Sequence, residues 1–378
     1  MTTPVWKKIL KYTLRSLEVI GITLLALLIT VYGAGLIITR GPSVNAKKLF
    51  VLSMNETSAA KWVPALFLSK DEIKGITDNR VTAADQGDVV IDTSLIKPDK
   101  NNDKDEEIEE NTPTYDSGDN LFIPDESDVF EETPEYDNVI VADDGVTIVE
   151  IKGSTYSGEM MIIDDPARVF VATLDAYGPE AHGLTLDQFI YKYDAIGGTN
   201  AGGFYDPNGE GNGGTPDGLV IGNSKILWGG EDKVHYCVIG FDEDNILHVG
   251  NFSGKMALYR KLVSAVSFAP GPLLVVNGKA MNETGELGGG LNPRTAIGQR
   301  ADGAILLLVV DGRQTHSLGA TYDDLVDIML EFGAVNAANL DGGSSTRMHY
   351  KGERMNQCAS MLGQRGLPNA ILIKKKEG

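Results

Sequence analysis

The pattern of apolar and polar positions begins with an apolar run that is too long for an ordinary core helix. Residues 17–39 contain one charged side chain, that of Glu18. As a helix this run spans about 34 Å, which is enough to cross the roughly 30 Å hydrocarbon core of a bilayer. We therefore expect one transmembrane anchor at residues 17–39.

The charges before this run predict its orientation. Residues 1–16 contain no acid and carry four basic side chains, those of Lys7, Lys8, Lys11 and Arg15. Because basic flanks stay in the cytoplasm, we expect a cytoplasmic tail at residues 1–16 and an extracytoplasmic bulk. A cleaved signal peptide is the alternative, since Val44-Asn45-Ala46 has the small-residue spacing of a cleavage site. Both interpretations export the rest of the chain.

Two segments of different character follow. Residues 40–96 mix apolar positions with lysines, and they predict short amphipathic helices beside the membrane or a small cap on the folded domain. Residues 97–138 carry sixteen acids against three lysines, which is a large share of the net charge of −20. Such a run, with few large apolar side chains, is typical of a disordered linker.

The pattern of residues 139–378 predicts a folded domain in which short strands alternate with glycine turns. Capping boxes begin two helices, at Thr185 to Gln188 and at Thr321 to Asp324, and Gly333 ends the second. Many strands with few helices indicate an α+β class, with mixed or antiparallel sheets packed on a few helices. Strands are expected at Val146–Ile151, Val169–Leu174, Gly218–Ile221, His235–Phe241, Leu273–Val276, Ala304–Val310 and Ala370–Ile373.

The two predicted helices are followed by similar segments. Each runs from an apolar strand to an asparagine and then a glycine pair, with Asn200, Gly202 and Gly203 in the first and Asn339, Gly342 and Gly343 in the second. This pattern suggests two similar halves that deliver two polar turns to one place, although one weak match also arises by chance.

The second turn carries the clearest candidate chemistry. Adjacent glycines allow close or left-handed backbone that turns amide groups toward an anion. The hydroxyl groups of Ser344, Ser345 and Thr346 follow, and Asp341 places a carboxylate beside them. These groups suit a phosphorylated sugar, whereas the structural alternative is a turn in which Asp341 caps its own backbone.

A hairpin supplies the candidate cation. Asn292 to Gly298 leads through a turn at Arg300 to Gly303 into the apolar strand Ala304–Val310, which ends at Asp311. Arg294 and Asp311 should therefore lie at the same end of the hairpin. Arginine binds phosphate through two parallel hydrogen bonds, and a plain Arg294–Asp311 ion pair is the alternative.

Five motifs occur in order along the chain: Asn200 to Asp206, Thr215 to Val220, Pro293 to Gly298, Val310 to Arg313 and Asn339 to Thr346. Together they resemble the phosphodiester glycosidase family, whose bacterial members are often described as exopolysaccharide-related. The resemblance covers about residues 139–375, and Ser344 stands where many relatives have a third glycine.

The resemblance implies hydrolysis of a sugar-1-phosphodiester in a surface glycan or glycan-phosphate polymer. We expect Asp341, Asp311 and Arg294 to be catalytic. A non-catalytic protein that binds phosphorylated polysaccharide and a metal-dependent phosphodiesterase are the alternatives. The expected substrate-binding residues are Asn200, Gly202, Gly203, Asp206, Thr295, Asn339, Gly342, Gly343, Ser344, Ser345 and Thr346.

Other chemistry has less support. No basic patch indicates a nucleic-acid partner, and no required cofactor is expected. Residues Asp206 to Asp217 match a calcium loop in part, but a mobile substrate loop is the favoured interpretation. Cys237 and Cys358 either pair after export or stay as separate thiols.

Overall fold

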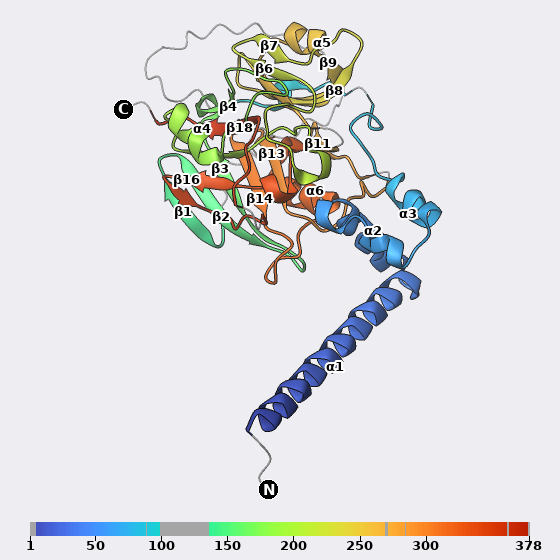
Figure 1. The fold of residues 1–378 in the computed structure, drawn as a ribbon. Coiled ribbons are helices and arrows are strands. Elements are labelled where there is room, and N and C mark those ends of the chain that lie inside the picture. Colours follow the sequence, from blue (N-terminus) through green and yellow to red (C-terminus); the bar gives the residue numbers. More distant parts are fainter. Residues whose placement is uncertain are drawn as a thin grey trace, which may run out of the picture.

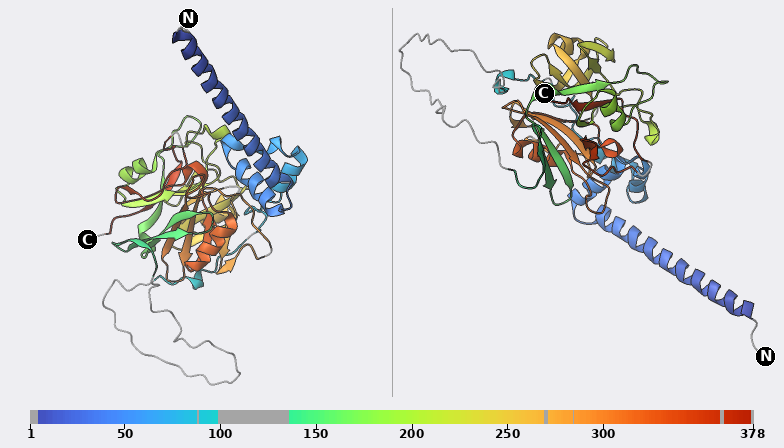
Figure 2. Two further views of the ribbon diagram at one scale, coloured as in Figure 1. Left: turned by 90° about the horizontal axis from the view of Figure 1, so that it is seen from below. Right: turned by 90° about the vertical axis from the view of Figure 1, so that its left-hand side faces the viewer.

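A long helix projects from a folded body in the computed structural model, which describes residues 5–87, 89–98, 136–268, 271–283, 285–360 and 363–376 (Figure 1). Both further views show this helix, α1 (Val5–Arg40), extending away from the body (Figure 2). Within the described residues it is one helix of the length and apolarity that can cross a membrane. The expected acidic linker at residues 97–138 lies largely outside the described residues, since residues 99–135 are not described.

The described residues form one eight-stranded sheet and two five-stranded sheets, and every described pair of strands is antiparallel. The expected α+β class with antiparallel sheets is therefore confirmed. In spatial order the large sheet contains β1 (Val139–Asp143), β2 (Val146–Lys152), β3 (Ser157–Ile163), β14 (Ile305–Val310), β13 (Arg294–Arg300), β15 (Ala334–Asn339), β11 (Leu273–Val276) and β12 (Lys279–Ala280).

The two smaller sheets pack beside the large one. The first contains β7 (Lys225–Trp228), β6 (Val220–Gly222), β10 (Leu262–Ser267), β8 (His235–Asp242) and β9 (Leu247–Ser253). The second contains β17 (Glu353–Arg354), β16 (Met348–Tyr350), β5 (Gly197–Asn200), β18 (Asn369–Ile373) and β4 (Val169–Thr173).

The burial of strand β14 on both of its faces explains why its sequence is a continuous apolar run. All six of its residues are buried, since Ile305, Leu307 and Val309 face the core between the sheets. Leu306, Leu308 and Val310 face a second core, which helix α6 (Tyr322–Glu331) covers. A strand covered on both faces has no polar alternation to show in its sequence.

The predicted helix starts and the predicted hairpin are confirmed. Thr185 caps α4 (Leu186–Lys192) and Thr321 caps α6, each through a complete capping box. Gly333 adopts a φ of +79° directly after α6, where a glycine is least strained. In the hairpin, Arg294 pairs with Val310.

A small helical cap joins α1 to the folded body. It contains α2 (Val44–Asn55), η1 (Ser58–Ala60), η2 (Val63–Leu66) and α3 (Lys70–Thr77). The chain then crosses η3 (Thr93–Leu95), with Ala83 and Ile91 in the core between the sheets. The remaining short helices are η5 (Pro166–Arg168), η6 (Pro207–Gly209), α5 (Gly254–Tyr259) and η7 (Gly343–Ser345). The cap thus packs on the domain as well as on α1.

The two cysteines are unpaired. Cys237 is buried in β8, where burial raises the pKa of its thiol to about 12, and Cys358 is half-buried. The sulfur of Cys358 accepts a hydrogen bond from Arg347 at 3.0 Å.

Replacing Leu307 by alanine should lower the stability of the domain by about 2–5 kcal/mol, because the cavity opens in a strand buried on both faces. The measurement is the free energy of unfolding of the full chain in detergent by guanidinium titration. Leu330→Ala is the control, since Leu330 is 37% exposed on α6. Equal losses for the two variants would contradict this account of the core.

Candidate functional site

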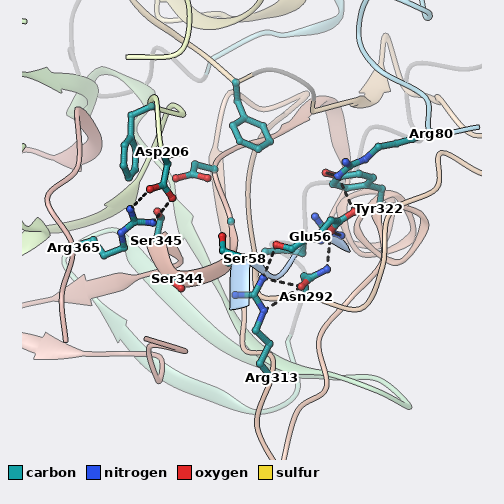
Figure 3. Close-up of a pocket in the computed structure, with 16 residues that line it drawn as sticks. Glu56, Ser58, Arg80, Asp206, Asn292, Arg313, Tyr322, Ser344, Ser345 and Arg365 are labelled. Carbon is teal, nitrogen blue, oxygen red and sulfur yellow. Dashed lines mark hydrogen bonds and ion pairs between the residues drawn. The ribbon is translucent and has the colours of Figure 1, made fainter. Parts of the chain in front are cut away.

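One polar cavity of about 200 Å³ lies where the cap meets the domain (Figure 3). Arg294 and Asp341 both line it, as the sequence argument requires. The other lining residues come from the cap, the segment after it, the loop after β5, the end of β10, the hairpin and the segment before it, α6, η7 and the chain before β18. They are Glu56, Ser58, Arg80, Phe204, Asp206, Phe268, Asn292, Arg313, Tyr322, Gly342, Gly343, Ser344, Ser345 and Arg365.

The two polar turns meet at this cavity although their strands belong to different sheets. The Asn200 side chain at the end of β5 donates to the backbone oxygen of Asp341 at 2.6 Å. The amide of Asp341 in turn donates to the Ala201 oxygen at 2.9 Å. Asn200 is fully buried and also accepts from the Thr295 hydroxyl at 2.9 Å. Asn200 therefore positions the Asp341 turn and does not line the cavity.

The glycine turn after Asp341 is tightly bonded within itself. Gly343 has a φ of +61°, and an added Cβ would lie 3.3 Å from the Arg313 guanidinium. Its amide donates to the Pro293 oxygen at 2.8 Å, while the amides of Ser345 and Thr346 donate to Gly342 and Gly343. The expected cradle of free amides is thus limited, because three amides of this turn already have carbonyl partners.

Asp341 is the carboxyl group whose environment favours proton transfer. Burial raises its pKa from 3.8 to about 7, against the opposing effects of the Ser345 hydroxyl, the Arg365 charge and the Gly342 amide. A carboxyl group with a pKa near neutrality serves well as a general acid or base.

Asp206 and Arg365 form a two-bond ion pair beside Asp341. Arg365 Nη1 and Nη2 donate to the two carboxylate oxygens of Asp206 at 2.7 and 2.6 Å (Figure 3). Burial of Asp206 opposes ionisation, but the bonds from Arg365 and the Gly211 amide lower its pKa. Asp206 is therefore ionised at neutral pH and holds Arg365 at the cavity wall.

Glu56 from the cap fills the other end of the cavity. Figure 3 labels Glu56, Arg80 and Asn292 at this end. The Glu56 carboxylate accepts hydrogen bonds from Arg80 at 2.7 Å and from Arg294 at 2.9 Å. The Asn292 side chain donates to it at 2.7 Å and the Gly290 amide at 3.2 Å. Arginine and amide donors of this kind also bind phosphate groups in proteins, and here they surround a carboxylate.

The shape of this end depends on Arg313 and Tyr322. Arg313 donates to the Glu56 backbone oxygen at 3.2 Å. The Arg294 guanidinium carbon lies 4.1 Å from the centre of the Tyr322 ring, a cation–π distance. Tyr322 is the first residue of α6, so the helix start fixes the platform for Arg294. A Cβ on Gly289, whose φ is +84°, would lie 2.7 Å from this ring, so the close approach requires glycine.

Asp311 is placed next to the cavity but does not line it. Its carboxylate accepts from the Gln357 amide at 3.1 Å and the Asn356 side chain at 3.2 Å, and it lies 3.1 Å from His316 Nε2. It lines a second cavity of about 700 Å³, whose other lining residues include Asn356, Gln357 and Arg347. Asp311 and Arg294 share the same end of the hairpin, yet Arg294 pairs with Glu56 instead.

The remaining predicted residues support the turns. Gly202 donates its amide to the Asn369 side chain at 2.6 Å, and Gly203 donates to the Ser267 oxygen at 3.1 Å. Thr295, Asn339 and Thr346 are buried behind the cavity wall. Gly342, Gly343, Ser344, Ser345 and Asp206 line the cavity as expected.

Several lining residues were not identified from the sequence. Asn292 directly precedes one of the five motifs and Arg313 ends another, so the sequence could have indicated both as site residues. Glu56 and Arg80 precede the acidic segment, and Arg365 lies close to β18, so no motif marked them. For the suggested calcium loop, both oxygens of Asp206 are bonded to Arg365. In the described ranges no three His, Cys, Asp or Glu side chains gather as a metal site.

Residues 193–374 match the family model described as phosphodiester glycosidase. This match confirms, for these residues, the resemblance that the five motifs indicate. The chain is also 35% identical over 140 residues to an uncharacterized SPbeta prophage-derived protein, YomE, of Bacillus subtilis strain 168. That match covers 36% of this chain and 21% of the relative, so the chain spans about a fifth of the relative's length.

Two solved structures are similar in fold. The catalytic domain of zebrafish N-acetylglucosamine-1-phosphodiester alpha-N-acetylglucosaminidase, described as auto-inhibited by its pro-peptide, is 21% identical with a TM-score of 0.49. The match covers 61% of this chain and 82% of that one. A protein of Burkholderia pseudomallei K96243 that is described as exported is 17% identical with a TM-score of 0.43, over 58% and 74% of the two chains.

Replacing Glu56 by alanine should make inorganic phosphate bind at least about tenfold more tightly, because the arginines lose their internal anion. Isothermal titration calorimetry of the full chain in detergent measures the affinity. Glu286→Ala is the matched control, since Glu286 pairs with Lys48 of the cap outside this cavity. Adding Arg294→Met to Glu56→Ala should remove the gain. An unchanged affinity in Glu56→Ala would contradict the assignment of this end as an anion site.

Proposed function

We propose, from the match of residues 193–374 to the phosphodiester glycosidase family, that this chain hydrolyses the glycosidic bond of a sugar-1-phosphodiester. The observation that carries the proposal is the position of Asp341, which has a pKa of about 7, in one cavity with a cluster of arginines around a carboxylate. The substrate is a phosphate-linked sugar of a surface glycan or a glycan-phosphate polymer.

The phosphate of the substrate takes the position of the Glu56 carboxylate. Arg80, Arg294 and Asn292 already donate to that carboxylate, and they present the same groups to phosphate oxygens. When Glu56 leaves, the cavity keeps four arginines against the two aspartates Asp206 and Asp341. This surplus of positive charge stabilises the phosphate as it departs.

Asp341 acts on the sugar. In the reaction the bond between the anomeric carbon and the phosphate oxygen breaks, and its electron pair leaves with the phosphate. The oxygen of water bonds to the anomeric carbon, and a proton of that water passes to the Asp341 carboxylate when Asp341 is the base. When Asp341 is instead the nucleophile, it bonds to the anomeric carbon first and water releases the sugar with retained configuration. The second pKa of a phosphate monoester is near 6, so the leaving group needs no strong acid.

Asp311 acts as a positioning residue in this proposal. Its carboxylate holds the Asn356 side chain and the Gln357 amide, and Asn356 also donates to the Thr346 oxygen at 3.4 Å. Asp311 therefore supports η7 from behind, and through η7 the residues beside Asp341.

Two other functions give different products. A phosphodiesterase breaks the P–O bond, and a binding protein releases nothing. Incubating the full chain with a chromogenic sugar-1-phosphodiester in oxygen-18 water distinguishes them by mass spectrometry. The proposal requires the heavy oxygen in the free sugar, and heavy oxygen in the phosphate or no product at all would refute it.

The chain is anchored in this proposal by α1, with the catalytic domain outside the cytoplasm. The support is the apolar surface of α1, which is exposed on all sides from Ile9 to Ile37 apart from its contact with the cap. The cap also restrains the enzyme, because Glu56 must leave before a phosphate can enter. Displacement of the segment around Glu56 is thus a step of the catalytic cycle.

Asp341→Asn should lower kcat/KM by at least about a thousandfold, because the amide can neither accept a proton nor attack the sugar. The thermal unfolding midpoint should change little, since the two side chains have the same shape. Asp302→Asn is the control, as Asp302 lies in the exposed hairpin turn with Arg300 as its partner. Turnover retained in Asp341→Asn would remove Asp341 from the chemistry.

The value of kcat/KM should rise with pH and level off above about pH 7, because Asp341 works in its ionised form and burial holds its pKa near 7. Arg365→Met should move this inflection to higher pH, because the Arg365 charge lowers the pKa of Asp341. Arg365→Lys keeps the charge and should stay nearer the wild-type profile. A kcat/KM that falls as the pH rises through 7 would instead assign Asp341 as a general acid.

A further inference from the structure

The C-terminal end of α1 packs against the cap, at a height along the helix that lies within the bilayer if α1 spans it. The Phe67 ring lies so close to Gly35 that a Cβ there would be 2.3 Å from a ring atom. Phe67 also packs on Tyr32, with ring centres 5.3 Å apart. Arg40 Nη1 bonds to Glu72 at 2.9 Å and fixes the last turn of α1 to α3. The cap is therefore held to α1 from Tyr32 to Arg40.

The height of this contact follows from the length of the helix. A hydrocarbon core of roughly 30 Å takes about 20 residues at 1.5 Å per residue. Because the apolar run starts at Leu17, just after Arg15, such a core extends to about residue 37. Tyr32 and Gly35 lie within that length, so Phe67 meets the bilayer near its surface.

Exposed apolar and basic side chains surround Phe67 in the sequence of the cap. Trp62 is 62% exposed, and Leu66, which directly precedes Phe67, is 53% exposed. Lys61 and Lys70 are exposed on either side of them. The Trp62 ring nitrogen donates to the Ala59 oxygen at 3.0 Å, which leaves the ring free to contact lipid. Tryptophan is enriched at both membrane–water interfaces, and long lysine side chains near a membrane reach its head groups.

We propose that Lys61, Trp62, Leu66 and Lys70 form a membrane-docking face that enters the lipid head groups and holds the cavity at the bilayer surface. Ser58 lines the cavity and stands four residues before Trp62, so at most about 14 Å of chain separates the cavity wall from the docking face. A phosphodiester on a lipid lies within that reach. The substrate class is then a sugar phosphodiester whose other ester group is a membrane lipid, which rests on the proposed function.

The first test measures the contact with lipid. The full chain is placed in nanodiscs whose anionic lipids carry bromine near the head-group end of the acyl chains, and the tryptophan fluorescence is compared with that in unbrominated lipid. Subtracting the emission of Trp62→Phe leaves the share of Trp62, since Trp6 and Trp228 are common to both proteins. Quenching of this share by about half or more is expected, and no quenching would overturn the docking face.

The second test measures turnover in the same nanodiscs with two substrates, a lipid-borne sugar phosphodiester and a water-soluble chromogenic one. The variant Trp62→Glu with Leu66→Glu should lose at least tenfold on the lipid-borne substrate and little on the soluble one. Tyr191→Glu is the matched control, because Tyr191 is 90% exposed on α4. Equal effects on the two substrates would overturn the assigned substrate class. A wild type inactive on both refutes the proposed function, and the quenching then decides the docking face alone.

Discussion

A cluster of buried arginines is costly unless a negatively charged or polar oxygen lies among them. Arg80, Arg294 and Arg313 meet at the cavity, and the Glu56 segment satisfies all three, two through its carboxylate and one through its backbone oxygen. Removing one partner from such a cluster leaves the others unpaired at a cost of several kcal/mol. The cap is thus attached to the domain by these charged contacts as well as by buried side chains such as Leu52, and a ligand that displaces Glu56 must bring a comparable anion.

The rest of the site depends on hydrogen bonds that join two turns of the backbone. The turns after β5 and β15 come from different sheets, and the bonds between Asn200, Ala201 and Asp341 join them. The Asn200 side-chain oxygen also accepts hydrogen bonds from the Thr295 hydroxyl and the Arg347 amide. One buried side chain therefore sets the positions of three segments. Asp341 obtains its burial, and so its raised pKa, from this junction.

The sequence predicted those structural features that depend on residues close together in the chain. The capping boxes of α4 and α6 and the β13–β14 hairpin are determined by short stretches of chain. The resemblance that the five motifs carry also implied that Arg294 and Asp341 share one site, and both line the cavity. Glu56, Arg80 and Arg365 were not predicted, because their roles depend on long-range packing that leaves no local pattern. Asp311 was placed at the correct end of the hairpin, but the direction of its side chain is decided by Gln357 and Asn356.

The strand order of the second small sheet has a consequence for how the chain is made. Strand β18 lies between β5 and β4, yet it is synthesised about 170 residues after β5. Until then the edges of β4 and β5 are open to wrong partners, and open edges promote aggregation. This layer therefore closes late, and its open edges need protection until residues 369–373 arrive.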